Sequence, residues 1–211
     1  PCQGFSFAGH QLAFEDPRSK LFFEFVRIIK ECKPKYFILE NVRMKQEFVD
    51  IITEHLGVAP LLINSALVSA QNRYRYYWTN IPNVGAPYDP EKEQLLLLDI
   101  LEMEVDPKYY CTDKMKNLYD GGKYLNPNYT SQGNRVHDIE EKSPTITAGS
   151  NGYSSGYICI DEPRKLTPVE CERLQTLPDN YTNCGISDTQ RYKALGNGWT
   201  VDVIAHILRQ I

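Results

Sequence analysis

The chain lacks the long apolar run that a membrane-spanning helix needs. Such a helix takes about 20 consecutive apolar residues, whereas the apolar run Leu95–Leu98 is far shorter. Hydrophobic residues make up 42% of the 211 positions and charged residues 24%, which is ordinary for a soluble globular domain. We therefore expect a protein without membrane association, made of one domain or of one domain with a smaller insert.

The chain also lacks the residue spacings of common metal sites. Its six cysteines include no Cys-x-x-Cys pair, and the four histidines are far apart along the chain. We therefore expect no zinc site, and we expect the cysteines to be reduced thiols of a cytoplasmic protein. Cys32 and Cys159 stand among apolar residues and are interpreted as inert core, whereas Cys2 stands between a proline and a glutamine in a predicted loop.

An excess of positive charge is absent as well. The formal net charge is -4 at pH 7, which argues against a protein that binds polyanions in general. A local basic face on an otherwise acidic protein is still compatible with DNA binding. Net charge alone therefore does not exclude a nucleic-acid partner.

The first 82 residues predict an α/β arrangement. Apolar residues recur at helical spacing over residues 21–32 and 48–56. Residues 36–39 form a nearly all-apolar run, typical of a buried strand in a parallel sheet, and residues 61–68 and 75–79 predict two further strands. This alternation predicts an open α/β sheet, with Glu40 at the carboxyl end of its strand, where ligands gather in such sheets.

The rest of the chain changes character twice. Residues 83–160 are polar, rich in tyrosine and interrupted by prolines and glycines, which predicts a loop-rich insert. Regular structure returns with Thr167-Pro168-Val169-Glu170, the pattern of a helix start with a capping box. Ser187 precedes a further helix that we expect to end at Gly196, and residues 201–208 predict a terminal amphipathic helix. We therefore divide the chain into 1–82, 83–160 and 161–211, with the last segment returning to the first.

Five short motifs follow one another outside the insert. They are Pro1-Cys2-Gln3, Glu40-Asn41-Val42, Gln71-Asn72-Arg73-Tyr74-Arg75, Leu166-Thr167-Pro168-Val169-Glu170 and Gly196-Asn197-Gly198. Each alone occurs by chance, but the five in this order resemble the DNA cytosine-5 methyltransferases of phage and bacteria. The resemblance implies a Rossmann-like sheet of the class I S-adenosylmethionine-dependent methyltransferases, with residues 83–160 as a small target-recognition insert.

The residue types in these motifs suit methyl transfer to cytosine. Carbon-5 of cytosine is a poor nucleophile until a thiolate adds to carbon-6, and the resemblance assigns this step to Cys2. Glu40 would protonate ring nitrogen 3, and Arg75 would hold the exocyclic oxygen as its charge grows. Arg73 would bind an anion or order a loop. The target base must rotate out of the duplex to be reached.

The same resemblance implies the cofactor and the partners. S-adenosylmethionine would supply the methyl group, and Pro1, Leu21, Asn197 and Gly198 are the expected cofactor-binding residues. Double-stranded DNA is the expected partner, with the polar side chains of residues 114–135 reaching phosphates and base edges. Because the insert is short, a homodimer is also compatible. The expected setting is restriction-modification in the cytoplasm of a bacterial or phage-infected cell.

The chain departs from the family pattern at its start. It does not begin with Met, and no glycine-rich strand-turn-helix precedes Cys2, so the family's N-terminal cofactor-loop motifs and strands are missing. A missing N-terminal segment or an N-terminal half on a separate chain is expected ahead of a degenerate gene fragment. Without that part, the chain by itself should bind S-adenosylmethionine poorly and can be inactive.

Two alternative functions remain open from the sequence. One is a noncatalytic DNA-binding or regulatory relative, which would need none of Cys2, Glu40, Arg73 and Arg75. The other is a tRNA cytosine-5 methyltransferase of the same fold. Half of a split methyltransferase is a variant of the main interpretation.

Overall fold

The computed structural model describes residues 20–149 and 153–211, which divide into two compact units. The described part of the first unit is residues 20–64, 74–87 and 206–211, and the second unit takes residues 65–73 and 88–205. This division differs from the one expected from the sequence, since residues 161–205 group with the loop-rich segment before them. Only the last six residues, 206–211, return to the first unit. The assignment of 83–160 to target recognition stays a prediction.

The first unit contains a three-stranded sheet of order β1-β3-β2. Its strands are β1 (Ile38–Val42), β2 (Leu61–Asn64) and β3 (Tyr74–Thr79). The central strand β3 pairs antiparallel with both neighbours. The α/β class is confirmed, but the expected parallel pairing of β1 is wrong for the described strands. An apolar run reports how deeply a strand is buried, and it carries no information on the direction of its neighbour.

The strand boundaries also move Glu40. Because β3 extends far enough to pair with Asn41 and Val42, β1 continues past Glu40 to Val42. Glu40 is therefore the third of five strand residues and does not lie at the carboxyl end. The second predicted strand is shorter than expected, because β2 ends at Asn64 and a 3-10 turn, η2 (Ser65–Leu67), follows.

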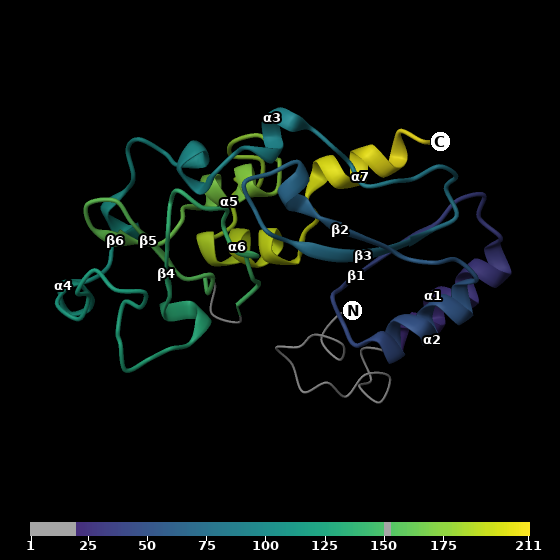
Figure 1. Ribbon diagram of the computed structural model, residues 1–211, viewed down its shortest axis with the longest axis horizontal. Coiled ribbons are helices and arrows are strands. Elements are labelled where there is room, and N and C mark those ends of the chain that lie inside the picture. Colours follow the sequence, from purple (N-terminus) through teal and green to yellow (C-terminus); the bar gives the residue numbers. More distant parts are fainter. Residues whose placement is uncertain (1–19, 150–152) are drawn as a thin grey trace. The chain divides into compact units, whose positions relative to one another are not determined.

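Helices α1 (Leu21–Cys32) and α2 (Gln46–Leu56) lie side by side on one side of these strands (Figure 1). Phe22 and Val26 of α1 and Ile52 of α2 are buried in one cluster with Trp78 of β3, which is fully buried. The predicted end of α2 is confirmed: Gly57 adopts the left-handed conformation, with φ 68°, and its amide donates to the Thr53 carbonyl at 2.8 Å.

The second unit is made of short elements, as the abundance of prolines and glycines predicts. Its small sheet has the order β4-β5-β6, with strands β4 (Val136–His137), β5 (Tyr157–Cys159) and β6 (Pro163–Arg164). Among the described residues before β5 there are two one-turn α-helices and several 3-10 turns, which are α3 (Pro90–Glu93), η3 (Leu97–Ile100), η4 (Pro107–Tyr109), α4 (Asp113–Lys116) and η5 (Gln132–Asn134). Leu97, Ile158, Leu174 and Leu195 lie in its largest buried cluster.

The C-terminal helices begin where the sequence predicts. The capping box of α5 (Pro168–Leu174) is confirmed, because Thr167 Oγ1 accepts from the Glu170 amide at 3.1 Å and the Glu170 carboxylate accepts from the Thr167 amide at 2.7 Å. Ser187 caps α6 (Asp188–Asn197), which ends one residue beyond Gly196. The last helix is α7 (Val201–Leu208). Among the described helices, none has the length and apolar character required to cross a bilayer.

Candidate functional site

Two predicted site residues, Cys2 and Pro1, lie outside the described residues. The predicted nucleophile and one predicted cofactor contact therefore stay predictions. The described candidates are Glu40, Arg73 and Arg75, which were assigned to catalysis, and Leu21, Asn197 and Gly198, which were assigned to the cofactor.

Glu40 and Arg75 form an ion pair across β1 and β3. Glu40 faces Tyr77 and Arg75 faces Val42 in the strand register, so the two charged residues are diagonal neighbours on one face of the sheet. Arg75 Nε lies 3.0 Å from Glu40 Oε1, and the side chains are only 13% and 18% exposed, respectively. Because little water reaches the pair, its electrostatic interaction is stronger than that of a surface pair. The structure thus brings together the acid and the clamp that were assigned to one pyrimidine ring.

Arg73 has a different environment. Its side chain is buried, and its guanidinium donates to the Ile146 carbonyl at 3.1 Å, to the Gly196 carbonyl at 3.1 Å and to the Gly198 carbonyl at 2.8 Å. Three backbone carbonyls of the second unit therefore surround one guanidinium. Of the two roles predicted for Arg73, these contacts favour loop ordering over anion binding.

The three described cofactor candidates are accessible to a ligand. Leu21, the first residue of α1, is 55% exposed. Asn197, the last residue of α6, is exposed, and Gly198 after it is half-buried. The Gly198 amide donates to the Leu195 carbonyl at 3.2 Å, which ends the helix and leaves the Asn197 side chain at its tip.

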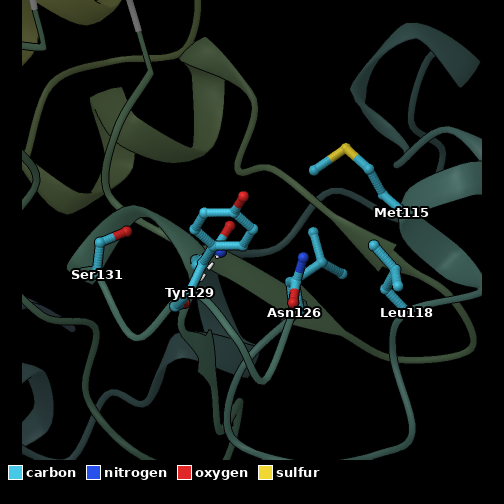
Figure 2. Close-up of a pocket in the computed structure, with 7 residues that line it drawn as sticks. Met115, Leu118, Asn126, Tyr129 and Ser131 are labelled. Carbon is cyan, nitrogen blue, oxygen red and sulfur yellow. Dashed lines mark hydrogen bonds between the residues drawn. The ribbon is translucent and has the colours of Figure 1, made fainter.

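A pocket of about 300 Å³ opens in the segment that was expected to contact DNA (Figure 2). It combines three apolar side chains with four polar or aromatic ones, which are Met115, Leu118, Leu125, Asn126, Tyr129, Ser131 and Asn134. The Asn134 amide group donates to the Tyr129 carbonyl at 3.0 Å, and the Tyr129 side chain is mostly exposed. In contrast, Lys116, which was expected to reach a phosphate, forms an ion pair with Glu162.

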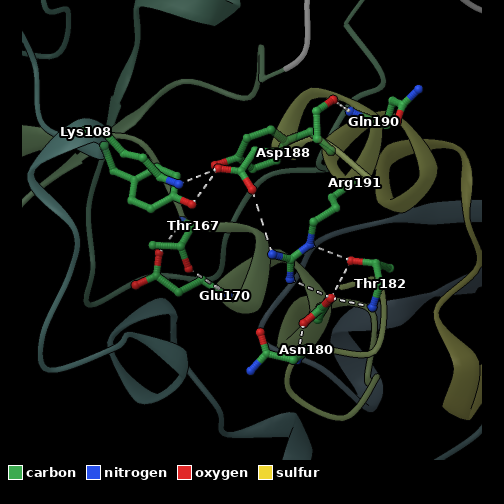
Figure 3. Close-up of polar contacts among 12 residues, drawn as sticks. Lys108, Thr167, Glu170, Asn180, Thr182, Asp188, Gln190 and Arg191 are labelled. Carbon is green, nitrogen blue, oxygen red and sulfur yellow. Dashed lines mark hydrogen bonds and ion pairs between the residues drawn. The ribbon is translucent and has the colours of Figure 1, made fainter. Parts of the chain in front are cut away.

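Two buried ion pairs of the second unit were not expected from the sequence. Glu170 accepts two hydrogen bonds from the Arg164 guanidinium, at 2.8 and 2.7 Å, and both side chains are almost completely buried. Glu172 lies 3.0 Å from Arg191 and also accepts from the backbone amide of Asn180 at 2.6 Å; Figure 3 labels Arg191 and Asn180. The capping-box pattern identified Glu170 as a cap, but no spacing rule pointed to either arginine partner.

Hydrogen bonds set the charge state of the acids in this polar cluster. Burial by itself raises the pKa of Glu172, but the hydrogen bonds from Thr182 together with the hydrogen bond and charge of Arg191 outweigh burial, and the pKa is lowered. Burial likewise raises the pKa of Asp188, but hydrogen bonds from Lys108 and Tyr109 outweigh it, and the net effect lowers the pKa. Both carboxylates are therefore charged at neutral pH. Glu172 ties the loop between α5 and α6 to α5, and Asp188 ties the start of α6 to Lys108 and Tyr109.

The described cysteines are free thiols that differ in exposure. Cys32 and Cys184 are exposed, whereas Cys111 and Cys171 are buried. The interpretation of Cys32 as core is therefore wrong, because α1 turns that position away from its buried stripe of Phe22 and Val26. Burial raises the pKa of Cys111 to about 11. Within residues 20–149 and 153–211, no group of three His, Cys, Asp or Glu side chains is arranged to hold a metal ion.

Known proteins resemble this chain over its full length. It is 34% identical over 235 residues to the type II methyltransferase M1.ScrFI of Lactococcus lactis subsp. cremoris, covering 100% of the chain and 60% of that relative. It is 33% identical over 230 residues to the type II methyltransferase M.NlaX of Neisseria lactamica, covering 100% of the chain and 73% of that relative. The chain thus spans only part of the length of the relatives it matches.

Solved structures show the same fold. The Entamoeba histolytica methyltransferase EhMeth matches with a TM-score of 0.75 at 20% identity, covering 100% of this chain and 74% of the other. A Spodoptera frugiperda DNMT2 mutant matches with a TM-score of 0.67 at 20% identity, covering 100% and 76%. The C-5 cytosine-specific DNA methylase family model matches residues 1–211. The ion pair of Glu40 and Arg75 thus lies in a chain that belongs to the C-5 cytosine-specific DNA methylase family.

Proposed function

We propose that the protein transfers a methyl group from S-adenosylmethionine to carbon-5 of cytosine in duplex DNA. The reaction proceeds through a covalent adduct of Cys2 with a base rotated out of the helix. The observation that carries the proposal is the ion pair of Glu40 and Arg75, 3.0 Å apart and shielded from water, in a member of this family. A regulatory relative without catalysis would have no use for this pair.

Glu40 and Arg75 are proposed to stabilise the electron density that the thiolate pushes into the ring, each at a different ring atom. When Cys2 adds to carbon-6, electron density moves into the ring and onto nitrogen 3 and the exocyclic oxygen. Glu40 acts here in its protonated form: a carboxylate in the ion pair with Arg75, it takes up a proton when the base binds and donates it, or a hydrogen bond, at nitrogen 3, while the Arg75 guanidinium stabilises the oxygen. Because Arg75 Nε already contacts Glu40 Oε1, the arginine also fixes the direction in which the carboxyl group points.

The second half of the reaction removes the carbon-5 proton and expels the Cys2 thiolate. A thiolate suits this role because it is both a strong nucleophile and a good leaving group. Arg73 is proposed to support these steps by ordering the backbone around residues 146 and 196–198, whose carbonyls its guanidinium contacts.

The accessible residues fit the cofactor in chemical type. S-adenosylmethionine supplies the methyl group when it is bound. An exposed leucine such as Leu21 suits one face of an adenine ring, and the Asn197 side-chain amide suits a charged amino-acid end. Gly198 is proposed to lie beside that end, with its own amide and carbonyl hydrogen-bonded within the protein. Pro1 is the remaining proposed contact.

Residues 83–160 are proposed to contact DNA. The pocket around Tyr129 presents two asparagine amides, Asn126 and Asn134, and such amides read base edges and phosphates in other complexes. Lys116 is the least suited of the predicted contacts, since it is already paired with Glu162.

The setting and the assembly are part of the proposal. A second polypeptide or an upstream segment would complete the cofactor pocket, and a homodimer would extend the surface that contacts DNA. The type II methyltransferases among the relatives support a role in restriction-modification in the cytoplasm of a bacterial or phage-infected cell.

A trapping experiment tests the reaction. The complete polypeptide that carries these residues is incubated with S-adenosylmethionine and duplex DNA containing 5-fluorocytosine, which cannot lose its carbon-5 substituent. We expect a covalent protein–DNA adduct that Cys2→Ser abolishes and Cys32→Ser retains. Replacing the duplex with tRNA tests the alternative substrate.

Glu40 is tested in the same assay. Glu40→Gln should slow adduct formation by about 10²–10⁴-fold, the usual contribution of general acid–base catalysis.

For the nucleophile, an adduct of equal yield in Cys2→Ser would remove the thiol from the mechanism.

A further inference from the structure

A buried polar cluster lies in the second unit, outside the catalytic pair. Gln71, Arg73, Gln175 and Thr200 belong to it, and none of their side chains is more than 3% exposed. Buried polar side chains are costly unless they are hydrogen-bonded. Gln175 is hydrogen-bonded to Gln71 and Thr200, and Arg73 shares the Gly198 carbonyl with Gln175. The cluster therefore holds chain segments that are far apart in the sequence.

The peptide groups of Ile146 are held on both sides by this cluster. The Ile146 amide donates to Gln71 Oε1 at 2.9 Å, and the Ile146 carbonyl accepts from Arg73 at 3.1 Å. Ile146 lies in the last part of the proposed target-recognition segment, residues 83–160. Gln71 and Arg73, which are two positions apart in the sequence, thus both hold the backbone of Ile146.

The turn after α6 is held by the same arginine. Arg73 donates to the Gly196 and Gly198 carbonyls at 3.1 and 2.8 Å. Gln175 adds a second support, because its amide donates to the Leu195 carbonyl at 2.6 Å and its oxygen accepts from the Thr200 hydroxyl at 3.0 Å. Asn197, which is proposed to contact the cofactor, sits within this braced turn.

The two held segments also touch directly. A Cβ atom added to Gly196 would lie 2.4 Å from the Ala148 nitrogen and 2.4 Å from the Thr147 carbonyl carbon. Such distances are too short for any side chain, so only glycine permits this approach of the two backbones. A displacement of the turn therefore has to move residues 147 and 148 as well.

We propose that Arg73 is a positioning residue that couples cofactor binding at Asn197 and Gly198 to the DNA-facing segment at Ile146. The inference rests on the proposed function. When a ligand orders the turn, the guanidinium holds Ile146 in its place too, so the second ligand meets a segment that is already ordered. Cooperativity of this kind needs no large movement, and it is reciprocal: each ligand raises the affinity for the other by the same factor.

The first experiment tests the clamp formed by the Arg73 guanidinium on the carbonyls of Ile146, Gly196 and Gly198. It measures amide hydrogen exchange without any ligand. Arg73→Lys keeps the charge but loses the planar fork that reaches several carbonyls at once. The matched control is Arg164→Lys, which makes the same change at another buried arginine of the second unit, one that contacts Glu170 and the carbonyl of Lys165. We expect hydrogen–deuterium exchange at residues 146–148 and 195–201 to rise about threefold to tenfold in Arg73→Lys, the effect of one weakened hydrogen bond, and to stay unchanged in Arg164→Lys. Equal exchange in the two variants would refute the clamp.

The coupling is tested in the complete polypeptide by measuring the Kd of S-adenosylmethionine with and without duplex DNA. In the wild type we expect DNA to tighten cofactor binding by at least about fivefold, the lower end of usual coupling. This factor should fall toward one in Arg73→Lys and persist in Arg164→Lys, even if Arg164→Lys unfolds at a lower temperature. A wild-type factor of one, or a factor unchanged in Arg73→Lys, would overturn the coupling.

Two further results distinguish a failure of the proposed function from a failure of the coupling proposal. If the wild type binds neither ligand, the proposed function fails, whereas the exchange experiment still decides on the clamp. If Arg73→Lys does not fold, Thr200→Val replaces it, because this change removes one hydroxyl, which donates to Gln175 and is also hydrogen-bonded to the Ser65 hydroxyl. The same reduction of the coupling factor, smaller in size, is then expected, and its absence would count against the proposal.

Discussion

Replacing Glu170 with leucine should destabilise the second unit severely. The Glu170 carboxylate is completely buried, it accepts from both terminal nitrogens of Arg164 at 2.8 and 2.7 Å, and it also accepts from the Glu102 amide at 3.0 Å. Glu170→Leu leaves the Arg164 guanidinium in the interior without its counter-charge. Such a broken pair costs about 3–5 kcal/mol, and the loss of the capping box adds about 1 kcal/mol.

The size of this effect is large relative to the stability of the protein. Single domains unfold with about 5–15 kcal/mol, so a loss of about 4–6 kcal/mol removes a large share. With a urea dependence of about 2 kcal/mol/M, the midpoint of unfolding should fall by about 2–3 M. Circular dichroism during urea titration at neutral pH measures this shift, and an unchanged slope shows that the denatured state is the same.

A double variant separates the buried charge from loss of packing. Arg164→Met together with Glu170→Leu removes both charges, and an apolar pair of similar volume in place of a buried ion pair is often neutral. Only the cap and the acceptor of the Glu102 amide are then missing, so the double variant should unfold within about 1–2 kcal/mol of the wild type. If the double variant is as unstable as Glu170→Leu, or if Glu170→Leu costs less than about 1 kcal/mol, the reasoning about the unpaired arginine is refuted.

Three further predictions address the backbone, pH and thiol chemistry. Gly57→Ala should cost about 1–2 kcal/mol, because alanine is strained at φ 68° while its methyl group meets no atom within 4 Å; Gly85→Ala, which is equally open but lacks a positive φ, should be neutral in the same thermal unfolding assay. The Glu172 pKa is lowered on folding, so its stabilising contribution is complete above the ordinary value of about 4.3 and is lost as the pH falls through the folded value. Unfolding free energies between pH 7 and pH 3 should fall more steeply in the wild type than in Glu172→Gln, and parallel curves would contradict this. Iodoacetamide at pH 8 should modify the exposed Cys32 well before the buried Cys111, whose pKa is about 11; equal rates on mass spectrometry would show that the burial is wrong.

The local rules of helix ends were enough to predict several elements. Gly57 was identified as a left-handed cap, and the Thr167 to Glu170 pattern as a capping box, because each depends on residues within one turn. No local rule predicted that Glu40 and Arg75 lie next to each other. That expectation came only from the family resemblance. The two residues are 35 positions apart in number, and no local pattern links them.

The features that the sequence did not predict depend on contacts between segments far apart along the chain. The position of β3 between β1 and β2 depends on three segments at once, and the partners of Glu170 and Glu172 come from outside α5. The role of Arg73 was ambiguous for the same reason. Whether a guanidinium meets a phosphate or a carbonyl depends on which distant backbone lies next to it, and here the segments near residues 146 and 197 provide carbonyls.

The strand order also dictates when the first unit can form during synthesis. β1 and β2 are both made before β3, yet neither pairs with the other, so both wait for a strand that reaches the ribosome exit later. Residues 206–211 of the same unit are translated long after β3. Both strands therefore stay unpaired until β3 has been made, and the first unit gains residues 206–211 only after the whole second unit has been translated.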